Sequence, residues 1–266
     1  MQPELPKTVK ITRTIDEAEG IKSFILPCRM QVRPGQFAML WLPGVDAKPV
    51  GISYWDQESV GVTVCAAGAW SRQVCSLKAG DLLGLFGPYG NSFELKGPRV
   101  VLVGGGYGAA TLMLLAEAIR NSNLKATLII GAKTEQLLLY RERCRQIGID
   151  TVYATDDGSF GAKGFTTDIL AEILKSEKVD TVYCCGPELM EQKVAQLCVA
   201  NKVPSQISLE RHMKCGFGVC GACAVDPSGK RVCVEGTIFS GAELLEMTEF
   251  GRYHRDSSAT KHRLRQ

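Results

Sequence analysis

Four cysteines near the C-terminal end constrain this chain more than any other feature of its sequence. Cys215, Cys220, Cys223 and Cys233 lie within nineteen residues, in the order C-x4-C-x2-C followed by a fourth cysteine. This order is typical of ligand sets for a [2Fe-2S] cluster, because its irons require soft thiolate ligands brought together by a tight loop. The sequence therefore predicts an iron–sulfur module in this segment.

The residues between these cysteines bear on the choice of metal. Gly216, Gly218 and Gly221 allow positive φ angles and bring backbone amides close to sulfur. Structural zinc is the alternative, but it favours paired C-x2-C knuckles, whereas this segment has one such pair and its nearest histidine, His212, lies outside the loop. Redox-inactive core cysteines are a third interpretation. We favour the iron–sulfur cluster.

The other seven cysteines are scattered through apolar segments. The chain has eleven cysteines in all, and residues 1–11 lack an apolar run long enough for a signal peptide or a spanning helix. An odd number of thiols without a secretion signal argues against a disulfide framework. We interpret these seven as small buried core residues of a soluble, cytoplasmic protein that does not enter a membrane: Cys28, Cys65, Cys75, Cys144, Cys184, Cys185 and Cys198.

Size and charge exclude some classes of function. The 266 residues suit about two domains and a small appended module. Charged residues make up 22% of the chain and the formal net charge is only +3. No strong field therefore points to nucleic acid, which we exclude as a partner.

The first part of the chain is predicted to form a small antiparallel barrel. Short apolar runs are separated by turn residues such as Arg33-Pro34-Gly35 and Leu42-Pro43-Gly44. These runs cover Lys22–Leu26, Gln36–Leu42, Gly61–Ala66 and Leu82–Phe86. We place this first domain at residues 1–97.

The second part alternates between predicted strands and helices. Strands are expected at Val100–Val103, Ala126–Ile130, Thr151–Ala154 and Thr181–Cys185. Helices are expected at Ala109–Ile119, about Glu135–Ile147, Thr166–Ser176 and Pro187–Ala200. This alternation predicts a parallel, doubly wound sheet at residues 98–204, with ligands at the carboxyl ends of its strands. The third part, residues 205–266, holds the cysteine motif and a basic tail, Arg252–Gln266, which is either a disordered, solvated segment or a docking element for a partner.

A glycine loop follows the first strand of the second domain. Gly104, Gly106 and Ala109 fit a GxGxx(G/A) pattern that opens a helix, where backbone amides can meet a pyrophosphate. A turn that merely tightens strand–helix packing is the alternative. The acidic ribose ligand of an ordinary Rossmann dehydrogenase is missing, because the next strand ends in Gly131-Ala132-Lys133. The sequence therefore disfavours that class of enzyme.

Two further segments follow strands at the same predicted edge of the sheet. Asp156 belongs to Thr155-Asp156-Asp157-Gly158-Ser159, which is either a dinucleotide contact or a plain polar turn. Cys185 begins Cys185-Gly186-Pro187, which could bring a thiol and a helix N-terminus towards a nicotinamide ring.

An iron–sulfur cluster implies a second cofactor if a nicotinamide dinucleotide is bound as well. The cluster carries single electrons and cannot accept a hydride directly, so a flavin must couple the two. Candidate flavin contacts lie at Lys48-Pro49-Val50-Gly51-Ile52-Ser53 and at Gly68-Ala69-Trp70-Ser71. An exposed lysine and ordinary turns would explain the same residues.

The order of these motifs resembles the ferredoxin-reductase superfamily. Within it, the chain most resembles the electron transfer subunits of dihydroorotate dehydrogenase B, and the likeness covers nearly the whole chain. It rests on Arg33–Phe37, Gly80-Asp81, Gly87–Asn91, Asp156–Ser159, Lys163–Asp168, Cys185–Pro187, Glu210–Gly216 and Cys233–Gly236. The resemblance implies a Greek-key FAD barrel, a five-stranded NAD domain and a small [2Fe-2S] module.

The resemblance also implies cofactor contacts. The family's Arg-Pro-x-Ser segment for FAD matches Lys48, Pro49, Val50 and Gly51, with Lys in place of Arg and Gly in place of Ser, so that Ser53 is a candidate substitute for the missing hydroxyl. Further implied FAD contacts are Thr63, Val64, Cys65, Trp70 and Ser71, where Trp70 stands at a position usually held by glycine. The implied NAD(H) contacts are Gly104, Gly106, Asp156 and Cys185.

The implied activity is a relay of electrons to NAD⁺. A separate catalytic subunit would oxidise dihydroorotate with FMN, for pyrimidine synthesis, in a heterotetramer with two copies of each subunit. Subunits of a sulfide dehydrogenase, a cytoplasmic hydrogenase or a ferredoxin:NADP⁺ reductase complex are the alternatives, because they use similar chains with other partners. A zinc-stabilised nucleotide-binding regulator and a free-standing flavin reductase are further alternatives.

Overall fold

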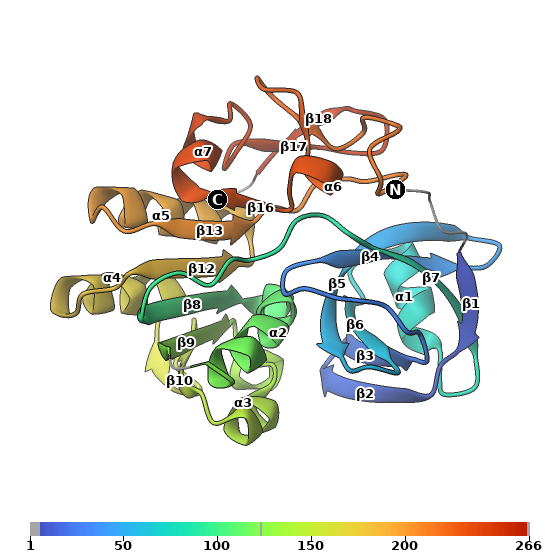
Figure 1. Cartoon of the computed structure of the whole chain (residues 1–266), viewed down its shortest axis with the longest axis horizontal. Coiled ribbons are helices and arrows are strands. Elements are labelled where there is room, and N and C mark those ends of the chain that lie inside the picture. Colours follow the sequence, from blue (N-terminus) through green and yellow to red (C-terminus); the bar gives the residue numbers. More distant parts are fainter. Residues whose placement is uncertain (1–5, 123, 265–266) are drawn as a thin grey trace.

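Two large sheets and a C-terminal module make up the computed structural model, which describes residues 6–122 and 124–264. One sheet is antiparallel and curls into a barrel, and the other is mostly parallel and carries helices on both faces (Figure 1). The module with the four cysteines lies across the top of both in this view. The predicted combination of an antiparallel barrel, a doubly wound domain and a C-terminal module is confirmed.

The barrel contains seven strands in the order β1-β7-β4-β5-β6-β3-β2. They are β1 (Lys7–Lys10), β2 (Arg13–Ala18), β3 (Ile21–Leu26), β4 (Phe37–Leu42), β5 (Asp46–Trp55), β6 (Val60–Cys65) and β7 (Leu82–Tyr89), and helix α1 (Ala69–Ser76) follows β6. Strand β5 is ten residues long and pairs with both β4 and β6, so that it belongs to both sides of the barrel. Buried aliphatic and aromatic side chains such as Phe24, Leu40 and Val62 fill the interior.

The second sheet has the order β11-β10-β9-β8-β12-β13-β16. Its strands are β8 (Arg99–Gly105), β9 (Lys125–Ala132), β10 (Asp150–Thr155), β11 (Ala162–Lys163), β12 (Thr181–Cys185), β13 (Ser205–Ser208) and β16 (Ile238–Ser240), of which β16 alone among these runs antiparallel to its neighbour. All seven residues of β8 are buried, as expected for the central strand of a sheet that is covered on both faces.

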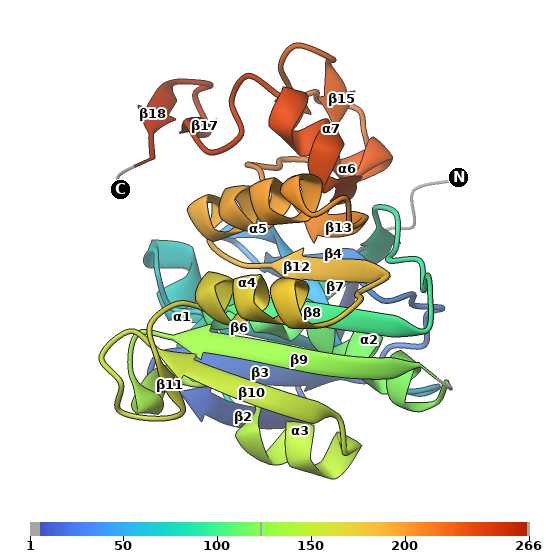
Figure 2. The same ribbon diagram turned by 90° about the vertical axis from the view of Figure 1, so that its left-hand side faces the viewer.

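Helices on the two faces of this sheet have different neighbours. Helices α4 (Thr166–Ser176) and α5 (Glu188–Ala200) lie on the face that points away from the barrel (Figure 2). Helix α2 (Ala109–Arg120), which the short helix η1 (Gly106–Gly108) precedes, lies on the other face and contacts β5 of the barrel (Figure 1). Nine of its twelve residues are buried, because it is covered by the sheet on one side and by the barrel on the other.

The helix predicted at Glu135–Ile147 is interrupted. A short helix η2 (Glu135–Leu137) and a separate α3 (Arg141–Ile147) flank residues 138–140. Leu138, Leu139 and Tyr140 are buried, and Tyr140 has a φ of +60°. Burial of these apolar side chains between the sheet and the barrel outweighs the local preference for a continuous helix.

The segment beyond residue 204 is built into the second sheet at two points. Strand β13 pairs with β12, and β16 pairs with β13. Between β13 and β16 the chain forms the cysteine loop, the hairpin of β14 (Ala224–Val225) and β15 (Lys230–Arg231), and helix α6 (Val232–Glu235). Helix α7 (Gly241–Glu246) follows β16 and packs on α5.

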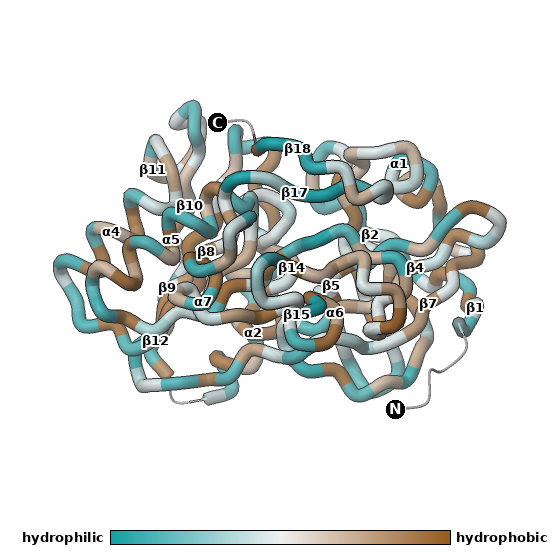
Figure 3. Tube along the Cα trace, turned by 90° about the horizontal axis from the view of Figure 1, so that it is seen from above, coloured by the Kyte–Doolittle hydropathy of each residue, from teal (hydrophilic) through white to brown (hydrophobic). Residues whose placement is uncertain are grey.

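The basic tail forms a β-hairpin as far as residue 264. Strands β17 (Tyr253–Arg255) and β18 (Lys261–Arg263) pair antiparallel, and Figure 3 shows both as hydrophilic segments at the surface. The described residues do not include residues 265–266 of the tail. They also do not include residues 1–5 of the N-terminal segment 1–11, in which no signal peptide is predicted. No helix in the described ranges has the length and apolar character needed to cross a membrane.

Candidate functional site

The four cysteines predicted as cluster ligands lie together in two pairs. The Sγ atoms of Cys223 and Cys233 are 3.3 Å apart. Cys215 and Cys220 form the other pair, in which the Cys220 amide donates to the Cys215 Sγ at 3.5 Å and the two side chains are also in hydrogen-bond contact. The β14–β15 hairpin and α6 position the first pair, whereas the glycine-rich loop positions the second.

The glycine-rich loop rests on the barrel. Gly216 has a φ of +82°, in the left-handed region that favours glycine. A Cβ atom at this position would lie 2.6 Å from Cγ of Met39 on β4, which is too close for any side chain. Gly216 therefore allows both the turn and the close approach of the cysteine loop to the barrel strand.

Backbone amides donate hydrogen bonds to three of the sulfurs, those of Cys215, Cys220 and Cys223, at 3.5 Å in each case. Burial raises the pKa of Cys215, but hydrogen bonds from the amides of Cys220 and Phe217 more than offset it and lower the pKa to about 7. The hydrogen bond shared by Cys223 and Cys233 lowers the pKa of Cys223 and raises that of Cys233. Cys215 and Cys223 are thus shifted towards the thiolate, which is the form that binds metal.

The paired arrangement fits a binuclear cluster better than a single ion. A zinc ion needs its ligands to converge on one point. In residues 6–122 and 124–264, no three His, Cys, Asp or Glu side chains form such a group. Two thiols on each side fit a [2Fe-2S] core, because two bridging sulfides leave each iron with two further ligands from the protein.

Asn91 on the barrel side holds the C-terminal module in place. Its side-chain amide donates to the carbonyl oxygens of Glu235 at 3.2 Å and Ile238 at 2.8 Å, and its Oδ1 accepts from the Ile238 amide at 2.8 Å. Its own backbone amide donates to the Gly236 oxygen at 2.6 Å. Because Asn91 follows Gly90 directly, one short turn of the barrel binds the segment just after Cys233.

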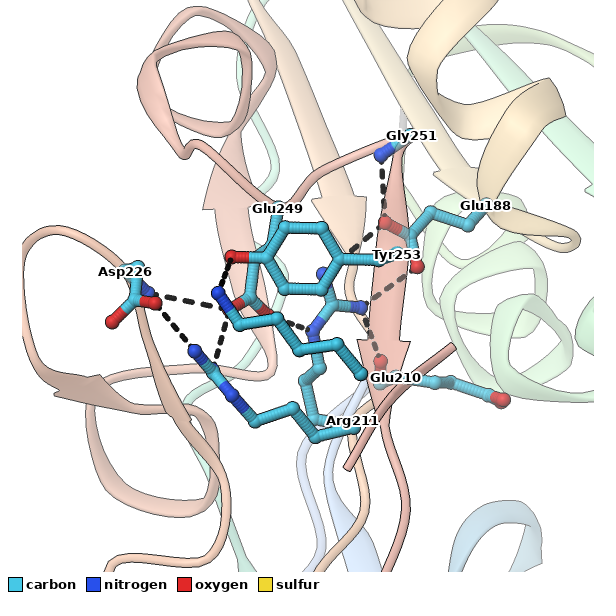
Figure 4. A network of polar contacts seen from close by, with 9 residues as sticks. Glu188, Glu210, Arg211, Asp226, Glu249, Gly251 and Tyr253 are labelled. Atoms are coloured by element: carbon cyan, nitrogen blue, oxygen red, sulfur yellow. Dashed lines mark hydrogen bonds and ion pairs between the residues drawn. The ribbon is translucent and has the colours of Figure 1, made fainter. Parts of the chain in front are cut away.

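Ion pairs join the same module to the second domain (Figure 4). Arg211 bonds to Glu249 at 2.6 Å and to Glu188, at the start of α5, at 2.8 Å. Arg255 of the tail hairpin bonds to Glu249 at 2.8 Å and also pairs with Asp226. The network therefore connects the helix α5, the segment before the cysteine loop, the module and the tail.

A cavity of about 90 Å³ lies where the barrel, the second domain and the module meet. Three of the residues predicted to contact FAD line it, and all three are on β5: Pro49, Val50 and Gly51. The remaining lining residues are Gly35, Phe37, Tyr107, Thr111, Ser208, Leu209, Glu210, Arg211, Met213 and Thr237. Sequence reasoning does not connect these residues with the flavin, because they become neighbours only when the three parts of the chain pack together.

Tyr107 and Glu210 form a polar pair at the edge of this cavity. The Tyr107 hydroxyl donates to Oε1 of Glu210 at 2.8 Å. The negative charge of Glu210 raises the pKa of Tyr107, so that the phenol stays protonated at neutral pH. The pair joins the glycine loop after β8 to the segment that leads into the cysteine loop.

A second cavity of about 550 Å³ adjoins the first and shares Glu210 and Arg211 with it. Lys48 lines this cavity together with Gly186, Pro187 and His212. Lys48 also forms an ion pair of 2.5 Å with Asp46. The predicted FAD lysine and the segment predicted to approach nicotinamide thus face one space.

Other residues predicted to contact FAD lie deeper in the barrel. The Ser53 and Thr63 hydroxyls are 2.7 Å apart and buried, and the Thr63 hydroxyl is also 2.7 Å from that of Tyr140. Val64 is buried beside Thr63, whereas Cys65 is half-buried. The last two predicted residues lie at the start of α1, where Trp70 donates through Nε1 to the Asp46 carbonyl at 3.0 Å and the Ser71 hydroxyl donates to the Gly68 carbonyl.

The predicted NAD(H) residues share one edge of the second sheet. Gly104, the next-to-last residue of β8, pairs with Cys185 at the end of β12, and Gly106 begins η1 directly after β8. Asp156 follows β10, and its amide donates to the Ala132 carbonyl at the end of β9. Burial raises the pKa of the Cys185 thiol well above its usual value, so that it stays neutral.

Two family models match the chain. Residues 102–196 match the oxidoreductase NAD-binding domain. Residues 210–245 match the iron-sulfur cluster binding domain of dihydroorotate dehydrogenase B and include all four paired cysteines.

Full-length relatives agree with these matches. A protein of Methanocaldococcus jannaschii is 43% identical over 258 residues, which are 97% of this chain and 98% of that protein. A protein of Pyrococcus furiosus is 39% identical over 250 residues, which are 94% of this chain and 96% of that protein. Each has the name "Probable dihydroorotate dehydrogenase B (NAD(+)), electron transfer subunit".

Solved structures share the fold. The NADH-dependent reduced ferredoxin-NADP oxidoreductase, described in connection with flavin-based electron bifurcation, superposes with a TM-score of 0.82 at 29% identity, over 91% of each chain. A ferredoxin NADP⁺ reductase from Neisseria gonorrhoeae, with bound FAD and NADP, has the same fold at a TM-score of 0.62 and 17% identity, over 73% of this chain and 91% of that one. The chain, an oxidoreductase with an NAD-binding and an iron–sulfur domain, therefore belongs to the family of dihydroorotate dehydrogenase B electron transfer subunits.

Proposed function

We propose that this chain relays electrons between a catalytic partner subunit and NAD(H), with FAD bound at β5 and a [2Fe-2S] cluster on the four cysteines. The observation that carries the proposal is the short distance along the chain between the two sites. Met213 lines the cavity, and Cys215 begins the ligand set two residues later. A single segment thus contributes to the walls of one site and to the ligands of the other.

The cofactors supply the redox chemistry when bound, since a [2Fe-2S] cluster carries single electrons and FAD exchanges a hydride with NAD(H). The protein's part is to hold the sites close together and to keep water out. Phe37, Val50, Leu209 and Met213 give the cavity apolar walls. The cysteine loop packs directly on β4, the strand that contains Phe37.

The residues assigned to each site follow the sequence predictions. Cys215 with Cys220, and Cys223 with Cys233, are proposed as the two pairs of cluster ligands. The proposed FAD contacts are Lys48, Pro49, Val50 and Gly51, together with the parts of Ser53, Thr63, Val64, Cys65, Trp70 and Ser71 that face the cofactor. The proposed NAD(H) contacts are Gly104, Gly106, Asp156 and Cys185 at the edge of the second sheet.

An apolar rim around the cluster loop suits the docking of a partner. Val219 is 78% exposed, and Phe217 and Val234 are 39% and 42% exposed. All three lie within two residues of cysteines of the ligand set, and Cys220 itself is exposed. Exposed apolar side chains in one patch are typical of protein interfaces. We propose that the catalytic subunit docks here, at the edge of the cluster.

The names of the relatives support the catalytic subunit of dihydroorotate dehydrogenase B as the partner. That subunit would contain FMN and oxidise dihydroorotate to orotate, which releases two electrons and two protons. Reduction of NAD⁺ to NADH takes up two electrons and one proton. We propose a heterotetramer with two copies of each subunit, in the cytoplasm, where the eleven thiols of this chain remain reduced.

The test is anaerobic purification with and without the catalytic subunit. We expect bound FAD, iron and sulfide, and a paramagnetic signal after reduction. Cys220→Ser should remove the iron but leave the reduction of dyes by NADH largely intact, whereas Cys75→Ser, at a distant site on α1, should keep the iron. Bound zinc instead of iron would refute the relay.

A second variant tests the docking surface. Val219→Asp should keep iron and FAD but lose co-purification with the catalytic subunit, because a charge in the centre of the apolar rim must be desolvated on docking. Co-purification equal to that of the unchanged protein would refute the proposed docking surface without affecting the cofactor assignments.

Ferredoxin-dependent reduction of NAD(P)⁺ is the second candidate. The solved ferredoxin-NADP oxidoreductase that is 29% identical favours it. The two candidates differ in their partners: orotate production from dihydroorotate by the reconstituted complex supports the first, and reduction by ferredoxin without a dihydroorotate-oxidising subunit supports the second.

A further inference from the structure

Gly51 and Thr111 face each other across the boundary between the barrel and the second domain. Gly51 lies on β5 and Thr111 on α2, and both line the cavity of about 90 Å³. A Cβ atom at position 51 would lie 2.7 Å from Oγ1 of Thr111. The threonine hydroxyl therefore occupies space that a side chain at position 51 would need.

The Thr111 hydroxyl also contacts the segment assigned to nicotinamide. Burial raises the pKa of the Cys185 thiol, and hydrogen bonds with the Thr111 and Ser208 side chains act in the opposite direction. Thr111 is 8% exposed. Its hydroxyl thus lies between the strand assigned to FAD and the thiol at the carboxyl end of β12.

The resemblance to the superfamily implies a hydroxyl at this place, and the sequence has none at position 51. The Arg-Pro-x-Ser segment of the superfamily corresponds to Lys48–Gly51 here, with glycine at the serine position. Ser53, the substitute considered from the sequence, is fully buried, and its hydroxyl bonds to Thr63 at 2.7 Å inside the barrel. Thr111 instead places its hydroxyl next to position 51 from the opposite side.

We propose that Thr111, whose hydroxyl lies between β5 and Cys185, supplies the hydroxyl that faces the flavin. Gly51 is required to make room for this hydroxyl. The assignment rests on the proposed FAD site. Helix α2 belongs to the NAD-binding domain, so the hydroxyl that would come from the barrel in the superfamily pattern comes from across the domain boundary. Thr111 then fixes the flavin relative to the nicotinamide edge by a hydrogen bond that forms only when the two domains are packed.

The first test removes the hydroxyl without changing the shape of the side chain. Thr111→Val should keep bound FAD but change the visible absorption spectrum of the flavin and slow its anaerobic reduction by NADH about tenfold, as expected for one lost hydrogen bond. Thr111→Ser keeps the hydroxyl and should stay within about twofold of the unchanged protein. Thr127→Val, which removes a buried hydroxyl bound to Arg99 in the same sheet, is the control and should leave the flavin spectrum unchanged.

The second test exchanges the two positions. Gly51→Ser alone should weaken FAD binding, because the new side chain collides with the Thr111 hydroxyl. The double variant Gly51→Ser with Thr111→Ala returns a hydroxyl from the barrel side and should recover both the spectrum and the rate. If Thr111→Val fails to fold, the comparison of Gly51→Ser with the double variant still tests the role of Thr111.

The outcomes separate this proposal from the function on which it rests. A flavin spectrum and a reduction rate that Thr111→Val leaves unchanged would overturn the role of Thr111 while FAD binding stands. The same holds if the double variant is no better than Gly51→Ser alone. A purified protein that binds no FAD under any condition would overturn the proposed function, and this assignment with it.

Discussion

Arg211 and Glu249 form an ion pair of 2.6 Å in which the two side chains are 4% and 1% exposed. Each has a second partner of opposite charge, Glu188 for the arginine and Arg255 for the glutamate. Such a pair offsets the cost of desolvation only when its hydrogen bonds are complete, and here they reach α5, the module and the tail hairpin. The position of the cluster module relative to the NAD-binding domain therefore depends on this network.

Loss of one partner from this network should be costly. Glu249→Gln leaves Arg211 buried with a single carboxylate, and we expect the free energy of unfolding to fall by about 3–5 kcal/mol. Denaturant unfolding followed by circular dichroism measures the change. Arg145→Ala is the matched control, because Arg145 and Glu142 form an exposed pair on α3 whose loss should cost at most about 1 kcal/mol. Equal losses in the two variants would contradict a role for burial.

The contact between the barrel and the second domain should loosen when Arg143 is replaced. Arg143 donates to the Ser53 carbonyl at 2.7 Å and to Glu117 at 2.8 Å, and its guanidinium lies 3.7 Å above the Tyr54 ring. Arg143→Ala should cost about 1.5–3 kcal/mol, the range for hydrogen bonds to charged groups. Limited proteolysis should then cut the linker near Gly97 faster. An unchanged rate of cleavage would show that the boundary does not depend on this side chain.

Glu191 should make stability depend on pH. It is 1% exposed and accepts a hydrogen bond from the Gly186 amide at 3.0 Å, and burial raises the pKa of its carboxyl well above the usual 4.5. The folded protein then keeps a proton that the unfolded chain loses, so stability is complete below pH 4.5 and falls as the pH rises towards the folded-state pKa.

Glu191→Gln removes this dependence because glutamine cannot ionise, and its Oε1 still accepts from Gly186. We expect the variant to be more stable than the unchanged protein at pH 8, by about 1.4 kcal/mol for each unit by which the pKa is raised, and equal to it near pH 4.5. Thermal melts of both proteins between about pH 4.5 and 8 provide the comparison. A constant difference across this range would contradict a neutral, buried Glu191.

The close contact of the cysteine loop with the barrel gives a fourth prediction. Gly216→Ala introduces a side chain in the left-handed region and 2.6 Å from Met39, so it should lower the iron content of the purified protein severalfold. Gly229→Ala is a matched control, since Gly229 has a φ of +70° in the β14–β15 turn but, among the residues that the structure describes, no atom within 4 Å of the place that an alanine Cβ would take. Iron analysis of both variants tests the contact, and an equal loss would assign the effect to backbone strain alone.

The parts of the fold that sequence predicts well are those with strong local patterns. The apolar run at Val100–Val103, the glycine loop and the amphipathic stretch at Thr166–Ser176 correspond to β8, η1 and α4 within a few residues. Strand β5 is not among the predicted runs, because Lys48, Pro49 and Gly51 have low β propensity and pairing with β4 and β6 outweighs it.

The cavity is less accessible to sequence reasoning. Thr111 lies in an apolar helix, so the sequence predicts a core residue at this position. Its hydroxyl becomes important only because Gly51 faces it from another domain. Glu249 has no local motif, and its pairing with Arg211 spans 38 residues. Contacts of this kind are set by packing between distant segments, which periodicity and spacing do not encode.

The chain leaves the second sheet after β13 and returns to it at β16, with the cysteine loop between these neighbouring strands. An inserted loop with both ends fixed in one sheet cannot swing like a domain on a flexible tether. A partner must therefore orient itself on a stationary target, and electron transfer within the proposed heterotetramer should not depend on internal motion of the module.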